Sequence, residues 1–233
     1  MEKYIKELVR MFVETTEYAN EKNVDFSIII TDDVYGTVLE DDPEYAGRIE
    51  NEPYGLFYIT KSEEQQLIIK NTQNVADVFH TLCHELIHIY DYNRLAKENA
   101  GIKIRDLQNN IFFLLWAEFH AEYCSYNYLI ERSKDDIDPK GVLTELQEKF
   151  KKYMDEKKTI NVQEVADFCV RLYGCYIALY DKFEIELNKY PKQFFINENF
   201  LSMYNYLYDH RSFDSIKGDL EELEGVFRRL ENS

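Results

Sequence analysis

The stretch FHTLCHELIHIYDYNRL, residues 79–95, decides how the first half of this chain is expected to fold. Apolar residues recur three and four positions apart through it and just before it, which is the periodicity of an amphipathic helix. The pattern predicts a helix from about residue 75, with Thr72 or Asn74 as its N-cap. The apolar stripe consists of Val75, Val78, Phe79, Leu82, Leu86, Ile89 and Tyr90.

Upstream of this helix, the sequence predicts one further helix and three short strands. Residues 2–21 have amphipathic helical spacing, and VDFSIII at 24–30 is rich in the β-branched residues that favour a strand. The polar segment 40–53 contains two prolines and is predicted to be a loop or lid. YGLFYIT (54–60) and QLIIK (66–70) flank a short polar link, which predicts a β-hairpin or two linked strands.

Downstream, the pattern is almost wholly helical. A second long helix is predicted from Ile104 to Arg132, and helices fill most of the chain from Val142 to Leu230. The predicted fold class is therefore α+β and mostly helical, with a small β-sheet, the helix that contains HELIH, and a helical C-terminal part. We expect a core domain at residues 1–135 and a helical subdomain, residues 136–233, packed on it.

Composition excludes some classes of partner. The 27 basic and 44 acidic residues give a formal net charge of −17 with no basic cluster, so no nucleic-acid partner is expected. The acidic excess serves solubility or a preference for a basic substrate. The four cysteines form no CxxC pair, and the N-terminus lacks the apolar block of a signal peptide, which favours reduced thiols in the cytoplasm. The longest apolar stretch, 111–117, is too short to span a membrane, so no membrane partner is expected.

The HELIH segment, residues 84–88, predicts a metal site. His84 and His88 are four positions apart, so on a helix both imidazoles can point at one ion, and zinc accepts neutral imidazole nitrogen. Glu85 lies about 100° round the helix from His84 and therefore flanks the ion instead of binding it. From there its carboxylate can act as a general base toward a metal-activated water and later pass the proton to a leaving amine. The alternative is an ordinary amphipathic helix whose histidines face solvent.

A catalytic zinc site usually has three protein ligands, so a third ligand is expected elsewhere. WAEFHAEY, residues 116–123, carries Glu118 and Glu122 on an otherwise apolar helix, where carboxylates are costly to bury unless paired or bound to metal. We assign Glu118 to the zinc and Glu122 to an outer position, where it would fix the tautomer of a ligand histidine. Asp91 shares the face of the two histidines and is either a second such partner, which we rank first, or the third ligand itself. In the alternative reading, both glutamates face solvent.

The remaining histidines have weaker assignments. A distant His or Tyr commonly stabilises the oxyanion in hydrolases of this kind, and His210 is the histidine that we predict for this role. The 19 tyrosines offer no basis for choosing among them. His120 lies two residues from Glu118, points elsewhere and is interpreted as structural, while His80 could extend the histidine stripe.

HELIH on a helix, followed by a helical Glu with a second acid four residues later, resembles the gluzincin arrangement of the zincin metallopeptidases. The longer pattern HELIHIYDYNRL…WAEFHAEY is also similar to the peptidase family of the mitochondrial intermembrane space that matures an ATP synthase subunit. The resemblance covers about residues 75–127, and the HExxH core is its specific part. The ImmA/IrrE-type regulatory peptidases of bacteria and phage, which also pair HExxH with a Glu on a later helix, are a second resemblance. The long acidic helical C-terminal half and the lack of a cysteine framework depart from the mitochondrial family.

The resemblance implies a zincin-like core in which His84, His88 and Glu118 bind zinc and Glu85 is the catalytic base. We therefore expect a zinc-dependent peptidase acting on peptide or protein substrates, with an edge of the small sheet lining the substrate cleft. The first alternative is a catalytically silent, metal-stabilised regulatory or interaction protein, associated with phage or mobile elements. The second is a helical binding module in which HELIH is accidental.

Overall fold

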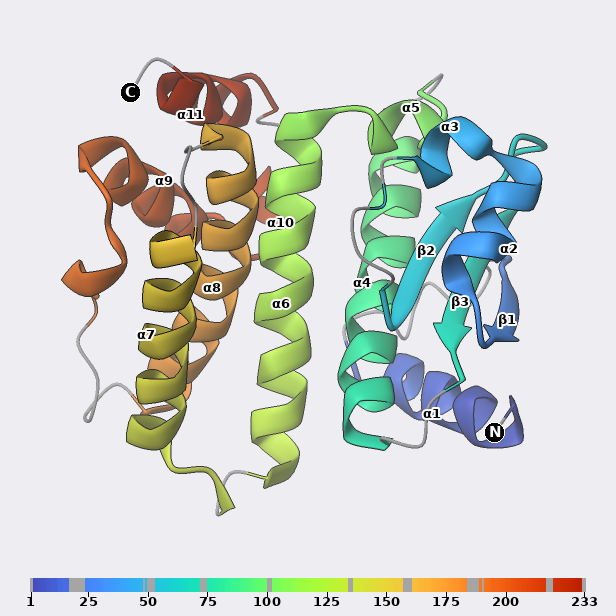
Figure 1. The fold of residues 1–233 in the computed structure, drawn as a ribbon, viewed down its shortest axis with the longest axis horizontal. Helices are drawn as coiled ribbons and strands as arrows, with labels where there is room; N and C mark the ends of the chain where they lie inside the picture. Colours follow the sequence, from blue (N-terminus) through green and yellow to red (C-terminus); the bar gives the residue numbers. More distant parts are fainter. Residues whose placement is uncertain are drawn as a thin grey trace. The chain divides into compact units, whose positions relative to one another are not determined.

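The computed structural model describes residues 2–16, 24–47, 49, 53–71, 75–99, 102–133, 136–156, 161–183, 189, 191–216 and 220–231. These ranges are mostly helical with one three-stranded sheet, which confirms the predicted fold class (Figure 1). None of the helices described there is long and apolar enough to cross a membrane. By packing, the chain forms two compact units, Met1–Leu107 and Gln108–Ser233. The predicted ranges, 1–135 and 136–233, place the division further along the chain and stay a prediction.

The first unit combines the sheet with helices before and after it. β1 is parallel to β3, and β3 is antiparallel to β2, so the strand order is β1-β3-β2. The predicted hairpin is confirmed, and the strand predicted at 24–30 is found at Ser27–Thr31, three residues later at its start. The elements are α1 (Glu2–Thr15), β1 (Ser27–Thr31), α2 (Val34–Asp41), α3 (Pro43–Ala46), β2 (Gly55–Ile59), β3 (Gln65–Lys70), α4 (Val75–Glu98) and α5 (Ile104–Gln108), the last of which reaches the boundary between the units.

The two faces of the sheet carry different helices, because side chains alternate along a strand. Phe57 of β2 faces α4, where its ring centroid lies 5.7 Å from that of Tyr92. Figure 1 shows α2 and α4 on opposite sides of the strands. The helix that contains HELIH is therefore held directly against the sheet. The face toward α2 forms a small core of buried residues: Val34, Val38, Ala46, Tyr58 and Ile68.

The prediction of a loop over residues 40–53 was wrong in its first part, because α2 extends into it as far as Asp41 and Asp42 begins α3 there. The Asp33 carboxylate accepts a hydrogen bond from the amide of Gly36 at 2.7 Å and starts α2. The Asp42 carboxylate accepts from the amide of Tyr45 at 3.1 Å, and proline follows at the first helical position of α3. Two other predictions, the end of the first helix at residue 21 and the N-cap of α4 at Thr72 or Asn74, lie outside the described residues.

The second unit is helical. The single helix predicted from Ile104 to Arg132 is in fact two helices, because the Asn110 side chain accepts hydrogen bonds from the amides of Phe112 and Phe113, both at 3.1 Å, and so begins α6. The described elements of this unit are α6 (Ile111–Ser133), α7 (Pro139–Glu156), α8 (Val162–Phe183), η3 (Lys192–Phe194), α9 (Glu198–Asp209), α10 (Phe213–Ile216) and α11 (Leu220–Glu231).

Helices α6 and α8 run parallel, side by side, through the second unit (Figure 1). Ion pairs fix the direction, since Glu118 pairs with Arg171, and Glu131 pairs with Lys182 further along both helices. The α6–α8 layer thus holds Glu118 in a rigid helical setting within its own unit.

Candidate metal centre

The HELIH segment lies in the middle of α4, where the helix brings its two histidines together. Both His84 and His88 are buried, and their Nε2 atoms lie 3.0 Å apart with the rings at 80° to each other. Two imidazole ligands on one tetrahedral zinc, each about 2.0–2.1 Å from the ion, have nitrogens about 3.3–3.4 Å apart. The pair therefore fits two neighbouring ligand positions of one zinc ion with a small adjustment. The alternative in which these histidines face solvent does not hold.

Glu85 is fixed at the open edge of the sheet. Its Oε2 accepts a hydrogen bond from the backbone N–H of Phe57 in β2 at 2.7 Å. The carbonyl of Tyr54 accepts from the amide of Lys70 in β3, and the amide of Thr60 donates to Glu64 just before β3. Residues an even number of positions from these two pair toward β3, so the N–H of Phe57 points away from β3 toward the edge. Glu85 is half-buried, and among the described residues no hydrogen bond to its Oε1 is present. The carboxylate is thus held by one oxygen, with the other available for proton transfer.

Gly55 allows the strand to approach this helix closely. A Cβ atom at residue 55 would lie 2.4 Å from the Thr81 methyl group and 3.4 Å from Cγ of Glu85. Any larger residue would push β2 away from α4 next to Glu85. The sequence analysis missed this position, although a glycine at the start of a predicted strand is itself a signal of close backbone approach.

Asp91 and His80 lie on the same helix as the two histidines, and the roles predicted for them stay predictions. Asp91 is fully buried, one turn beyond His88 on the same helix. His80 lies one turn before His84, with its ring centroid 6.3 Å away, and is half-buried. Three imidazoles therefore follow one another along this face of α4, with the closest approach between the second and third.

Glu118 lies on α6 in the second unit, where it is buried and not solvent-facing. Its Oε2 lies 2.9 Å from a guanidinium nitrogen of Arg171 in α8. Glu122, one turn further along α6, is half-buried and accepts from the Cys175 thiol over 3.7 Å. Burial, and next the charge of Glu122, raise the pKa of Cys175 well above its usual value, so this thiol is neutral and not a nucleophile. The role of Glu122 beside a ligand histidine stays a prediction.

The two remaining histidines make local contacts within the second unit. His120 is fully buried, stacks on Trp116 with ring centroids 4.7 Å apart, and lies 3.3 Å from the Cys124 sulfur. His210 ends α9, where its ring stacks on Tyr206 and its carbonyl accepts from the Trp116 indole N–H at 2.9 Å. These contacts tie His210 to its own unit, and its role in stabilising an oxyanion stays a prediction.

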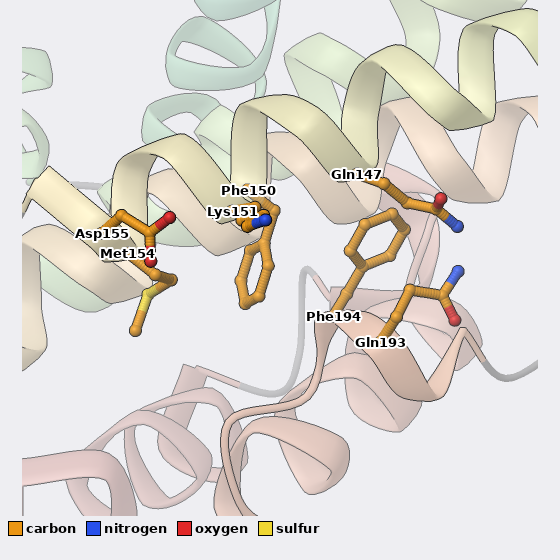
Figure 2. Close-up of a pocket in the computed structure, with 7 residues that line it drawn as sticks. All are labelled: Gln147, Phe150, Lys151, Met154, Asp155, Gln193 and Phe194. Atoms are coloured by element: carbon orange, nitrogen blue, oxygen red, sulfur yellow. The ribbon is translucent and has the colours of Figure 1, made fainter.

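A cavity of about 480 Å³ lies elsewhere in the second unit, between α7 and η3 (Figure 2). Phe150, Met154 and Phe194 form its apolar part, and Gln147 and Gln193 stand at one end. None of the predicted site residues lines it. The cavity is therefore separate from the chemistry that the sequence predicts.

Comparison of the chain with protein-family models, curated proteins and solved structures finds no match. The case for a metal centre therefore depends on the residues themselves. The four cysteines, all within the described ranges, form no disulfide.

Proposed function

We propose that this protein is a zinc-dependent peptidase in which Glu85 is the general base. The observation that carries the proposal is the geometry of α4: two buried imidazole nitrogens 3.0 Å apart, next to a carboxylate anchored at the open edge of the sheet. A helix without function has no need to bury two histidines with their ring nitrogens facing each other. The α+β fold with its edge strand beside the HELIH helix supports the same class of reaction.

We further propose Glu118 as the third ligand. His84 and His88 supply two buried imidazoles, and Glu118 is a buried carboxylate that the sequence assigns to the same ion. Two neutral imidazoles and one carboxylate are donors that suit zinc and leave one coordination position for water or substrate. Asp91 remains the alternative ligand, because it lies on α4 itself.

In the proposed reaction, the metal ion, Glu85 and the backbone of β2 would each have a separate role. A zinc ion held there would polarise a peptide carbonyl and acidify water. Glu85 would accept a proton from water and deliver it to the leaving amine, while the Phe57 N–H keeps the carboxylate in place. An extended peptide could lie along β2 and pair with its outward backbone groups other than the Phe57 N–H, which Glu85 already uses.

Metal removal tests the proposal as a whole. Protein purified without added zinc should contain about one zinc per chain, and it should cleave an unstructured protein such as casein. A chelator should abolish cleavage, and zinc should restore it, because the ion supplies the Lewis acid. Cleavage that persists after complete metal removal would refute the proposal. A parent that binds zinc but cleaves no member of a peptide library would favour the silent regulatory protein instead.

Alanine substitutions test the choice of third ligand. Glu118→Ala should weaken zinc binding more than Glu122→Ala, because loss of a direct ligand exceeds loss of an outer partner, which costs about 10–100-fold in affinity. Zinc affinity is measured by competition with a chelator of known strength. If Asp91→Ala proved the most damaging of the three variants, the ligand would be reassigned to Asp91.

A further inference from the structure

The cavity between α7 and η3 is bordered on one side by a single face of α7. Its lining residues on this helix recur at three- and four-residue intervals, which places them along one face over about 12 Å of helix length. Residues of η3 form the opposite border (Figure 2). The lining residues are Gln147, Phe150, Lys151, Met154 and Asp155 of α7, and Gln193 and Phe194 of η3. The cavity is therefore elongated and lies wholly within the second unit.

The η3 side of the cavity is held in place by contacts with α7 and α8. Phe194 is fully buried, and its ring lies edge-on to Phe150 and Tyr176, with ring centroids 5.8 and 5.7 Å away. Its carbonyl accepts a hydrogen bond from the Tyr173 hydroxyl at 3.0 Å, and its amide donates to the carbonyl of Pro191 at 2.9 Å. The apolar part of the cavity is therefore preformed, and a ligand would bind there with little rearrangement.

The lining combines apolar side chains with two carboxamides. The volume of about 480 Å³ lies within the range of about 300–1,000 Å³ that is typical of ligand sites. Phe150, Met154 and Phe194 suit an aromatic or large aliphatic group. Gln147 and Gln193 stand together at one end (Figure 2). A carboxamide carries an N–H donor and a C=O acceptor, the same two groups as a peptide bond, so this end is suited to bind peptide groups.

The charge of the lining favours an uncharged ligand. Lys151 and Asp155 contribute one positive and one negative charge, a formal total of zero for the described residues that line the cavity. A phosphate-bearing ligand would need an excess of positive charge, and the whole chain has a net charge of −17. An extended polypeptide rises about 3.3 Å per residue, so about 12 Å accommodates about three to four residues. Length and charge together point to a short stretch of uncharged polypeptide.

We propose that this cavity binds an extended polypeptide segment with an aromatic or large aliphatic residue at its centre. The central side chain enters the part formed by Phe150, Met154 and Phe194, and the neighbouring peptide groups pair with Gln147 and Gln193. This inference goes beyond the proposed function, because the binding site requires neither a metal ion nor Glu85. The two proposals can therefore fail independently.

The test uses the full chain in the presence of a chelator, so that an active peptidase would not degrade the probe. The probe is the peptide acetyl-Ala-Phe-Ala-amide, and binding is followed by NMR shifts of the backbone amides that line the cavity. We expect saturable binding with a Kd of about 1 mM or tighter, as for other small ligands in preformed pockets. Acetyl-Ala-Ala-Ala-amide should bind about 10–100-fold more weakly, because burial of a phenylalanine side chain supplies that difference.

Substitutions test the two parts of the cavity separately. Met154→Lys brings a charge into the apolar part and should weaken binding about 10-fold or more. Gln147→Leu and Gln193→Leu keep the size of the side chain but remove its donor and acceptor, and each should weaken binding about 2–10-fold. Gln163→Leu is the matched control, since it makes the same change at an exposed position of α8 outside the cavity, and it should bind as the parent does. Thermal unfolding confirms that each variant is folded, and Gln193 is exposed, so its variant serves if Gln147→Leu does not fold.

Three results would overturn the inference. The first is the absence of any shift in the lining amides at about 10 mM peptide, ten times the expected Kd. The second is equal affinity for the two peptides, which would show that the apolar part takes no side chain. The third is tighter binding of adenine than of acetyl-Ala-Phe-Ala-amide at the same amides, which would make the site one for nucleobases. All three leave the zinc proposal untouched, and a parent without zinc that binds the peptide as expected would leave this inference intact.

Discussion

Glu85→Gln should bind zinc as the parent does, fold as stably, and lose about 10²–10⁴-fold in the rate of peptide cleavage, the range typical of general acid–base catalysis. Glutamine keeps the size of the side chain, and its carbonyl oxygen can still accept the hydrogen bond from the Phe57 N–H. What it lacks is a basic carboxylate. Because we propose that Glu85 flanks the ion instead of binding it, zinc affinity should be unaffected by the change.

The measurement is the rate of casein cleavage at equal zinc content, with thermal unfolding to confirm the fold. Glu98→Gln is the matched control, since it makes the same chemical change at an exposed position of the same helix. It should cleave at the parent rate. If the parent is active and Glu85→Gln cleaves casein at the same rate, then Glu85 is no general base and only holds the edge of β2 against α4.

The candidate site was predictable where geometry is local. His84 and His88 are one helical turn apart, so any helix through HELIH brings their rings together, and the apolar stripe was enough to predict that helix. The hairpin was predictable for the same reason, because its two strands are joined by a short polar link. The position of Glu85 beside the histidines follows from helix geometry, but its anchor on β2 does not.

Features that depend on distant parts of the chain were not predictable. Arg171 lies on a helix far from Glu118 in sequence, and no local pattern indicates that α8 runs parallel to α6. The need for glycine at positions 55 and 174 is visible only in the folded chain, because a Cβ atom there would meet atoms of the opposing helix. Two local signals were also misread: Asp42 before a proline begins α3, and Asn110 ends the continuity of the long predicted helix. In both cases a capping side chain outweighed the composition of the segment around it.

His84→Ala and His88→Ala should each lose most of the bound zinc and with it the stability that zinc provides. Binding to the folded state alone stabilises it by about 2.7 kcal/mol when free zinc is 100 times the dissociation constant. Removing one of three ligands weakens binding so far that this increment disappears at the same zinc concentration. The parent should therefore unfold at a higher temperature with zinc than with chelator, whereas each variant should unfold at the same temperature in both.

His80→Ala is the control for this comparison, because it removes an imidazole from the same face of α4, one turn before His84. It can change the stability of the helix, but it should keep the zinc-dependent difference in unfolding temperature. Comparing each variant with and without zinc cancels any loss of packing, since that loss is common to both conditions. Full zinc retention in both His84→Ala and His88→Ala would exclude a metal centre on α4, and the close approach of the two rings would then be a matter of packing alone.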